Sequence, residues 1–323
     1  MRMRRRFLGM LLIVSVALCG CQNSEDVFLS YQKTSSSRAE VFDNHLMERE
    51  FFAKDIAIAT EEDNVGGDEE LTIGASLLIN KTDTQVIYAD KVYDKLYPAS
   101  LTKLLTALVV FRYGEITDMV TIGNNAANIG VSGVKLCGFK EGDTITLEAL
   151  LNCMLIYSGN DAAIAVAEHV GGNVEAFVEL MNEEAHKIGA VHSNFVNPHG
   201  LHDEDQYSTA YDLYLIFNEL LQYDTFRNII STSSYTANYN DREGNAKDMS
   251  LRSTNLYLRD GQELDSGIKI IGGKTGTTNK AGNCLVLLSK GKSEKEYISV
   301  ILKASDSDEL YTQMSYLLTT FTN

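Results

Sequence analysis

Apolar residues from Leu71 onward recur at the spacings of strands and helices. Residues 71–80 and 84–89, which are rich in apolar and β-branched side chains and flank the polar turn Lys81-Thr82-Asp83, predict a β-hairpin. After Pro98, leucines and valines cover much of the circumference of the next segment. This pattern predicts a helix that is buried on nearly all sides.

The middle of the chain is predicted to be mainly helical, and strands return near its end. The helical candidates are residues 147–156, 161–169, 174–188 and 210–222. The later strand candidates are residues 268–271, 282–288 and 297–302, followed by an amphipathic segment over 306–321. Strands therefore bracket a helical insertion over about 115–250. A folded part of about 250 residues is large enough for one core with two lobes.

The amino terminus has the pattern of an export signal. Four arginines precede an uncharged apolar run from Phe7 to Leu18. This run is shorter than the roughly 20 residues that a membrane-spanning helix needs. Because Leu18-Cys19-Gly20-Cys21 resembles a lipobox, we expect residues 1–20 to be a signal peptide and Cys21 to carry a lipid. The lipid would anchor the protein on the outer face of a bacterial membrane. Ordinary cleavage and secretion is the alternative.

The net charge is strongly negative. It is −16 for the whole chain and becomes −20 once residues 1–20, with their four arginines, are removed. Such a surface repels nucleic acid and anionic lipid, so we expect no nucleic-acid partner and a membrane attachment that depends on the lipid. Residues 21–70 are polar and acidic, which predicts a stalk. Residues 71–323 then form the folded domain.

Three cysteines follow Cys21, namely Cys137, Cys153 and Cys284, and none belongs to a C-x-x-C pair. A structural metal site or a dense disulfide framework is therefore not expected, while a single bridge stays open.

Ser100 and Lys103 form the first candidate chemical motif, at the start of the predicted buried helix. Their spacing places both side chains on one helical face. A lysine whose pKa is lowered by burial could take the proton of the serine hydroxyl. The helix amino terminus would add amides and partial positive charge for an oxyanion. A helix cap followed by a surface lysine has the same pattern.

Ser158 and Asn160 form the second motif, between two predicted helices. The hydroxyl could relay a proton to a leaving amine, and the amide could hold a substrate carbonyl. Either residue could instead cap the next helix.

The third motif, Gly-Gly-Lys-Thr-Gly-Thr-Thr at residues 272–278, follows a predicted strand. Glycines let a ligand approach the backbone closely, here around Gly276. The charge of Lys274 and the hydroxyls of Thr275 and Thr277 suit a carboxylate. A nucleotide-binding P-loop is not favoured, because Gly273 intervenes before the lysine and a strand is predicted to follow.

The motifs S-x-x-K, S-x-N and K-T-G, in this order, are the set found in β-lactamases and penicillin-binding proteins. On these motifs the chain resembles the D-alanyl-D-alanine carboxypeptidases, the low-molecular-weight penicillin-binding proteins. The resemblance covers about residues 70–320. It is carried by Tyr97–Leu108, Ser158–Ala163, Asn194–Leu201 and Lys274–Gly282.

This resemblance implies an α+β fold of the β-lactamase/D,D-peptidase type, in which an antiparallel sheet flanked by helices meets an all-helical lobe. It implies Ser100 as the acylated nucleophile, Lys103 as its base and Ser158 as proton donor to the departing D-alanine. It further implies roles for Asn160 in catalysis, for Lys274, Thr275, Gly276 and Thr277 in substrate binding, and for the Ser100 and Thr277 amides as the oxyanion hole.

The resemblance also implies what the protein would bind. The substrate would be a peptidoglycan stem peptide ending in D-Ala-D-Ala, β-lactams would be inhibitors, and neither a metal nor another cofactor would be needed. We expect a monomer. Many relatives carry a further carboxy-terminal β domain and membrane helix after the catalytic part, whose anchoring role the lipid on Cys21 would take here.

Other activities stay open. Thr277-Thr278 is reminiscent of β-lactamases and transpeptidases, and an endopeptidase is equally compatible with the motifs. A class A β-lactamase needs a glutamate after S-x-N, whereas the matching segment Glu148–Asn152 comes before it. A zinc peptidase would rest only on His199, His202 and Asp203. The G-x-S-x-G signature of esterases is missing. A cell-wall-binding lipoprotein without catalysis is the non-enzymatic alternative.

Overall fold

The computed structural model describes residues 55–60, 62–64, 68–259, 264 and 267–322. Residues from Ala53 onward belong to one compact unit. The predicted signal peptide, Cys21 and residues 22–54 of the predicted stalk lie outside the described residues. No helix within the described ranges is both long and apolar enough to cross a membrane.

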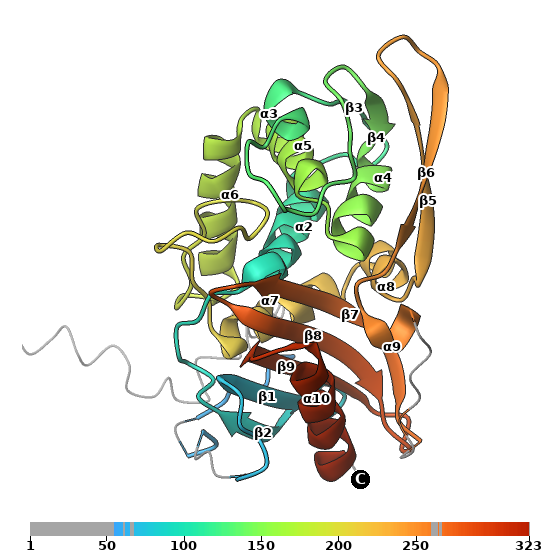
Figure 1. Ribbon diagram of the computed structural model, residues 1–323. Helices are drawn as coiled ribbons and strands as arrows, with labels where there is room; N and C mark the ends of the chain where they lie inside the picture. The colour runs from blue at the N-terminus through green and yellow to red at the C-terminus, as the bar shows by residue number, and fades with distance from the viewer. Residues whose placement is uncertain (1–54, 61, 65–67, 260–263, 265–266, 323) are drawn as a thin grey trace, which may run out of the picture. The chain divides into compact units, whose positions relative to one another are not determined.

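A five-stranded antiparallel sheet forms the first lobe, in the order β2-β1-β9-β8-β7 (Figure 1). Its strands are β1 (Ala75–Asn80), β2 (Gln85–Asp90), β7 (Lys269–Thr278), β8 (Gly282–Lys290) and β9 (Glu296–Ala304). The predicted hairpin and the three later strands are thereby confirmed. β1 and β9 pair directly, so segments from both ends of the described fold share one sheet. β7 forms one edge of this sheet.

Both faces of this sheet are covered, because neighbouring residues of a strand point to opposite sides. Leu77 of β1 packs in the core that also contains helices α2 (Thr102–Tyr113) and α7 (Ala210–Leu220), whereas Leu78 packs with Met314 and Leu317 of helix α10. α10 (Ser307–Phe321) begins where the Asp306 carboxylate accepts a hydrogen bond from the Glu309 amide. The central strands are consequently apolar on both faces.

The second lobe is mainly helical, as expected, but it also contains a sheet that the sequence pattern did not predict. Its larger helices are α2 (Thr102–Tyr113), α4 (Leu147–Asn152), α5 (Asn160–Gly171), α6 (Val174–Lys187), α7 (Ala210–Leu220) and α8 (Asp224–Ile230). The short helix α3 (Asn124–Ala127) also belongs to this lobe, whereas the short helix α9 (Leu256–Arg259) packs against α10 of the first lobe.

The additional sheet corrects the expectation of an all-helical lobe. It has the order β3-β4-β5-β6, with strands Met119–Thr121, Thr144–Thr146, Ser234–Asn240 and Ala246–Arg252. β3 and β4 have three residues each, too few to show an alternating pattern. β5 and β6 form a hairpin with one polar, exposed face. The other face packs against the core through Tyr235, Ala237, Tyr239, Met249 and Leu251. The residues between Tyr239 and Met249 are nearly all polar, so this part of the sequence has the pattern of a loop.

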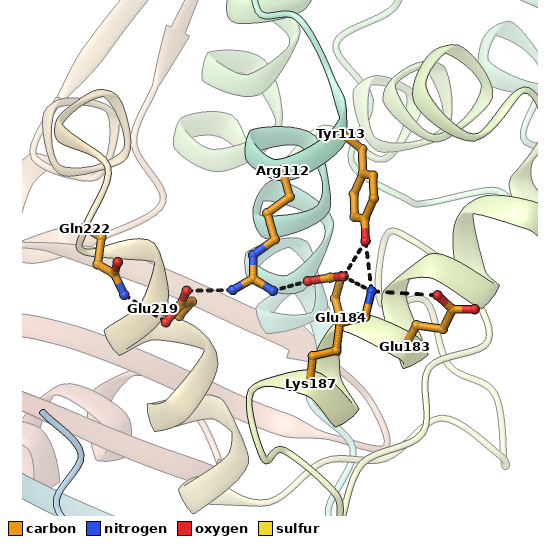
Figure 2. A network of polar contacts seen from close by, with 7 residues as sticks. All are labelled: Arg112, Tyr113, Glu183, Glu184, Lys187, Glu219 and Gln222. Carbon is orange, nitrogen blue, oxygen red and sulfur yellow. Dashed lines mark hydrogen bonds and ion pairs between the residues drawn. The ribbon is translucent and has the colours of Figure 1, made fainter. Parts of the chain in front are cut away.

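Helix α2 crosses the second lobe and is buried from Thr102 to Val110, as predicted. An ion-pair network holds its carboxyl end (Figure 2). Arg112 forms ion pairs with Glu184 of α6 and with Glu219 of α7, the latter at 2.6 Å. Glu184 also accepts hydrogen bonds from the Tyr113 hydroxyl at 2.5 Å and from Lys187 at 2.7 Å. These contacts tie the carboxyl end of α2 to two other helices.

Candidate active site

A cleft of about 1040 Å³ lies between edge strand β7 and the helical lobe. The structure brings all eight of the predicted site residues together there. Six of them line the cleft, namely Ser100, Ser158, Asn160, Thr275, Gly276 and Thr277. The other two, Lys103 and Lys274, are buried beneath it and contact the lining serines.

Ser100 lies in a 3-10 turn, η3 (Ala99–Leu101), that leads directly into α2. Ala99 has a left-handed φ of +49°, which a residue with a Cβ adopts only when its surroundings enforce it. Two glycines lie directly against this turn. A Cβ on Gly276 would lie 3.0 Å from the Ser100 nitrogen, and one on Gly200 would lie 1.9 Å from the Ala99 oxygen. The turn that presents Ser100 is therefore held between β7 and the loop that contains Gly200.

Lys103 follows Ser100 by three residues, and its ammonium nitrogen lies 3.0 Å from the Ser100 Oγ. The nitrogen also donates to Asn160 Oδ1 at 2.7 Å and to the carbonyl of His199. All three partners are neutral oxygens, and the side chain is fully buried. Burial, aided by the nearby positive charge of Lys135, lowers the pKa of Lys103 to about 7, against the opposing effects of Asp161 and Cys137. A substantial neutral fraction at pH 7 makes Lys103 able to accept a proton.

Ser158 and Asn160 follow a π-helical turn, η4 (Cys153–Tyr157), that ends the helix predicted as continuous over 147–156. Ser158 has a left-handed φ of +70°, and Asn160 then begins α5. The backbone N–H of Asn160 donates to the Lys135 carbonyl at 2.9 Å. Asp161 accepts from the amides of Cys137 and Gly138. The S-x-N motif is thus tied to residues 135–138 by one backbone hydrogen bond and by the carboxylate of the adjacent Asp161.

Lys274 lies on β7 and donates to Ser158 Oγ at 2.9 Å and to the Thr275 carbonyl at 2.8 Å. Its side chain is only 1% exposed. Burial, with the added repulsion of Lys103 and Lys135, lowers the pKa of Lys274 well below its ordinary value. The site therefore contains two serine–lysine pairs, one for each serine of the predicted motifs.

Thr275 and Thr277 point into the cleft from β7. The Thr275 hydroxyl donates to the Thr254 hydroxyl at 2.6 Å, and the exposed Thr277 hydroxyl donates to Asn283 Oδ1 at 3.0 Å. Because β7 is an edge strand, the backbone groups on its outer side are available to pair with an extended ligand.

Sequence reasoning missed three contributors to the site. The His199 carbonyl holds Lys103, Thr254 binds Thr275, and Lys135 supplies both a carbonyl for Asn160 and a positive charge. His199 lies in the Asn194–Leu201 segment that carried part of the family resemblance. Its contribution is a backbone oxygen, however, so no side-chain pattern could have marked it.

The histidines are arranged differently from a metal site. His199 Nδ1 accepts a hydrogen bond from the Leu201 amide, and burial lowers the pKa of His199 to about 3. His202 packs edge-on against Tyr97. Within the described ranges no group of three or more His, Cys, Asp or Glu side chains could hold a metal ion. Cys137, Cys153 and Cys284 are all free thiols, so the single bridge left open above is not formed.

Comparison with known proteins agrees with this geometry. Residues 60–306 match a family model described as D-alanyl-D-alanine carboxypeptidase. The D-alanyl-D-alanine carboxypeptidase DacF of Bacillus subtilis is 34% identical over 76% of this chain and 60% of its own length. The D-alanyl-D-alanine endopeptidase of Escherichia coli is 30% identical over 77% of both proteins.

Solved structures show the same architecture. The crystal structure of the Streptomyces K15 DD-transpeptidase aligns with a TM-score of 0.68 at 28% identity, covering 76% of this chain and 97% of that protein. The α+β fold of the β-lactamase/D,D-peptidase type is thereby confirmed. The chain spans about 60% of the length of the carboxypeptidase relatives it matches.

Proposed function

The chain belongs to the D-alanyl-D-alanine carboxypeptidase family, and on that basis we propose that it removes the terminal D-alanine from peptidoglycan stem peptides through an acyl-enzyme on Ser100. One observation carries this proposal. The fully buried Lys103, with a pKa of about 7, lies 3.0 Å from the Ser100 hydroxyl, and its hydrogen-bond partners among the described residues are all neutral oxygens. It is therefore suited to act as a general base near neutral pH.

In the acylation step, neutral Lys103 takes the proton of Ser100 as the Oγ attacks the carbonyl carbon of the penultimate D-alanine. The new oxyanion would lie between the amides of Ser100 and Thr277, since Gly276 brings β7 against the Ser100 turn. Asn160, which already holds Lys103, would also contact the acyl portion of the peptide.

Departure of D-alanine requires a proton on its amine. Ser158 is placed to supply it, because its Oγ lies 2.9 Å from the Lys274 ammonium, which can replace the proton that the serine gives up. The terminal carboxylate would be received by Lys274, Thr275 and Thr277 along β7. Water then hydrolyses the ester on Ser100.

Penicillin would acylate Ser100, and the resulting acyl-enzyme would be hydrolysed slowly. None of the described residues that line the cleft is Asp or Glu, so this part of the chain offers no carboxylate there to activate a deacylating water. This favours an enzyme inhibited by β-lactams over a β-lactamase. Cleavage of cross-linked stem peptides is the second candidate, because the endopeptidase of E. coli matches this chain over an equal share of both proteins.

The site of action would be outside the cell membrane. The arginines and the apolar run before Cys21 support removal of residues 1–20 and attachment of a lipid to Cys21. Radiolabelled palmitate should enter the protein in growing cells, and Cys21→Ala should abolish that labelling. Unchanged labelling of this variant would refute the anchor.

The proposed activity is tested by measuring D-alanine release from N,N′-diacetyl-Lys-D-Ala-D-Ala together with the intact mass after penicillin treatment. Wild-type protein should release D-alanine and gain one penicillin mass on Ser100. Ser100→Ala should lose both, while Ser293→Ala, which changes an exposed serine in the β8–β9 turn, should keep both. Unchanged release by Ser100→Ala would refute the assignment. Cross-linked dipeptide substrates assayed in parallel separate the endopeptidase from the carboxypeptidase.

A further inference from the structure

The loop that contains His199 contacts both of the groups that would react with each other first. The His199 carbonyl accepts a hydrogen bond from Lys103, the base of the proposed function. The next residue, Gly200, lies so close to the turn before Ser100 that a Cβ there would be 1.9 Å from the Ala99 oxygen. Gly200 also has a left-handed φ of +87°. The shape of this loop therefore influences where the base and the nucleophile lie.

The side chain of Asn197, at the start of the loop, sets this shape. Its Oδ1 accepts hydrogen bonds from the backbone N–H groups of Gly200 at 2.7 Å and of His199 at 3.3 Å. Its Nδ2 donates to the Leu201 carbonyl at 3.0 Å. An asparagine side chain that binds backbone groups a few residues ahead closes a tight turn. Both ends of the Asn197 amide are thus used to fold residues 197–201.

Asn197 reaches Lys103 through a single peptide unit. The N–H of Gly200 and the C=O of His199 belong to the same peptide, which is trans. In a planar trans peptide these two groups point in opposite directions. Asn197 binds the N–H on one side of this peptide, and Lys103 binds the C=O on the other. Hydrogen bonds in such a chain also polarise one another.

Asn197 is itself held in place by buried partners. Gln206, which is 2% exposed, accepts a hydrogen bond from the backbone N–H of Asn197 at 3.0 Å and donates to its Oδ1 at 3.3 Å. Thr106 of α2 donates to the carbonyl of the next residue, Pro198, at 2.6 Å. The backbone and the side chain of Asn197 are both fixed by these contacts, so its amide has a defined orientation.

We propose that Asn197 is a positioning residue, which orients the His199 carbonyl and thereby aims Lys103. This inference rests on the proposed function. Without the Asn197 side chain, the peptide that follows His199 would be able to rotate. Lys103 would then keep two of its three hydrogen-bond partners, namely Ser100 and Asn160. Proton transfer from the Ser100 hydroxyl would become slower, because the two groups would be aligned for a smaller part of the time.

The same change has a second consequence, for the pKa of Lys103. A carbonyl that accepts a hydrogen bond from an ammonium stabilises the charged form, so its loss lowers this pKa. Because Lys103 must be neutral to act, the fall of the rate at low pH should then have its midpoint at a lower pH. The other charged or titratable groups around Lys103 keep their identity, namely Asp161 on α5, Cys137 and Lys135 in the loop before β4, Lys274 on β7 and the neutral ring of His199.

The test measures kcat and KM for D-alanine release from N,N′-diacetyl-Lys-D-Ala-D-Ala between pH 5 and 9. In Asn197→Ala, kcat on the plateau above the midpoint should fall about 10- to 100-fold with KM changed less than about twofold, while the midpoint moves to lower pH. Asn197→Asp keeps an oxygen acceptor for the Gly200 N–H, so it should recover most of the plateau rate. Its negative charge should move the midpoint to higher pH.

Asn80→Ala is the matched control. Asn80 is also a buried asparagine that closes a turn, because its Oδ1 accepts a hydrogen bond from the Asp83 N–H at 3.0 Å, but this turn joins β1 to β2. Asn80→Ala should lower Tm and leave the midpoint in place. Partial unfolding lowers the amount of active protein at every pH, so it cannot by itself move the midpoint.

The outcomes separate the two proposals. If the wild-type protein releases no D-alanine and is not acylated by penicillin, the proposed function fails. If the wild-type protein is active but Asn197→Ala keeps its plateau rate, or loses rate with an unmoved midpoint, the inference fails and Asn197 only supports the fold. Movement of the midpoint in the same direction in both Asn197 variants would also overturn it. If Asn197→Ala does not fold, an unmoved midpoint in Asn197→Asp overturns the inference.

Discussion

Charged side chains are buried near both ends of helix α2, but they are partnered in different ways. At the carboxyl end, Arg112 and Glu184 form an ion pair, and Tyr113 and Lys187 complete the hydrogen bonding of the carboxylate. At the amino end, Lys103 is fully buried, and within the described part of the chain it donates to neutral oxygens alone.

The difference in partners decides what each end can do. Although burial alone would raise the pKa of Glu184, hydrogen bonds from Lys187, Tyr113 and Arg112 lower it, so this carboxylate stays charged and serves the fold. Burial without a strong counterion lowers the pKa of Lys103 to about 7, so this lysine can exchange a proton. Glu184, which has cationic partners, therefore stabilises the helix, whereas Lys103, which has no strong counterion, is able to exchange a proton.

The largest expected effect comes from removing the unpaired charge. Lys103→Met keeps the shape of the side chain but not the base, so kcat/KM for D-alanine release should fall by about 1000-fold or more. The free energy of unfolding should change by less than about 1 kcal/mol, because an unpaired buried ammonium contributes little net stability. Activity assays and thermal unfolding of the same preparation check both statements. Activity above a tenth of the wild-type value would contradict the assignment of the base.

Breaking the ion-pair network at the carboxyl end of α2 should have the opposite effect, with a loss of stability and little change in activity. Glu184→Gln leaves Arg112 and Lys187 without this carboxylate and should lower the free energy of unfolding by about 3 kcal/mol, or Tm by about 10 °C. At 25 °C, kcat/KM of the folded protein should stay within about twofold of wild type. Glu243→Gln is the control, because it alters an exposed ion pair with Arg242 and should cost less than about 0.5 kcal/mol. Equal losses in the two variants would show that the network does not stabilise α2.

The pH dependence of the rate sharpens the comparison further. Lys103 must be neutral to accept the Ser100 proton, so kcat/KM should fall as the pH drops below about 7, by up to about tenfold per pH unit. Lys135→Gln should move this midpoint to higher pH, because the positive charge that helps to lower the pKa of Lys103 is removed. Glu184→Gln should leave the midpoint in place. A rate independent of pH between 5 and 8 would argue against Lys103 as the base.

The smallest effect is expected inside the paired network. Glu219 is 27% exposed and lies on the solvent side of Arg112, where it also accepts a hydrogen bond from Gln222. Glu219→Gln should therefore cost about 0.5–1 kcal/mol in thermal unfolding, clearly less than Glu184→Gln. A loss as large as that of Glu184→Gln would place the main support of α2 on the α7 side instead.

Much of the fold could be predicted from periodicity because the apolar segments are long and buried. The hairpin of β1 and β2, the buried helix α2 and the strands β7 to β9 all appeared at about their predicted places. The hairpin of β5 and β6 and the π-helical turn before Ser158 did not. The short apolar face of the hairpin is interrupted by a long polar stretch, and a turn set by the packing around it has no periodic signature.

The residues that the structure brings together in the cleft could be proposed from the sequence, because the motifs depend on which side chains are present and in what order along the chain. Ser100 with Lys103, Ser158 with Asn160, and the Lys274 triplet are recognisable without coordinates. The residues that surround these motifs in space are not recognisable from the sequence. Lys103 meets Asn160 from 57 residues away and the His199 carbonyl from 96 residues away.

The sequence by itself thus determined which side chains would be candidates for the reaction, and it determined the family of the fold. Only the tertiary structure decided that Lys103 and Lys274 are buried without strong counterions, that Glu184 is buried with them, and that Lys135 faces the cleft. The physical reason is that a pKa depends on burial and on charges brought near by packing. Neither quantity is carried by the spacing of residues along a chain.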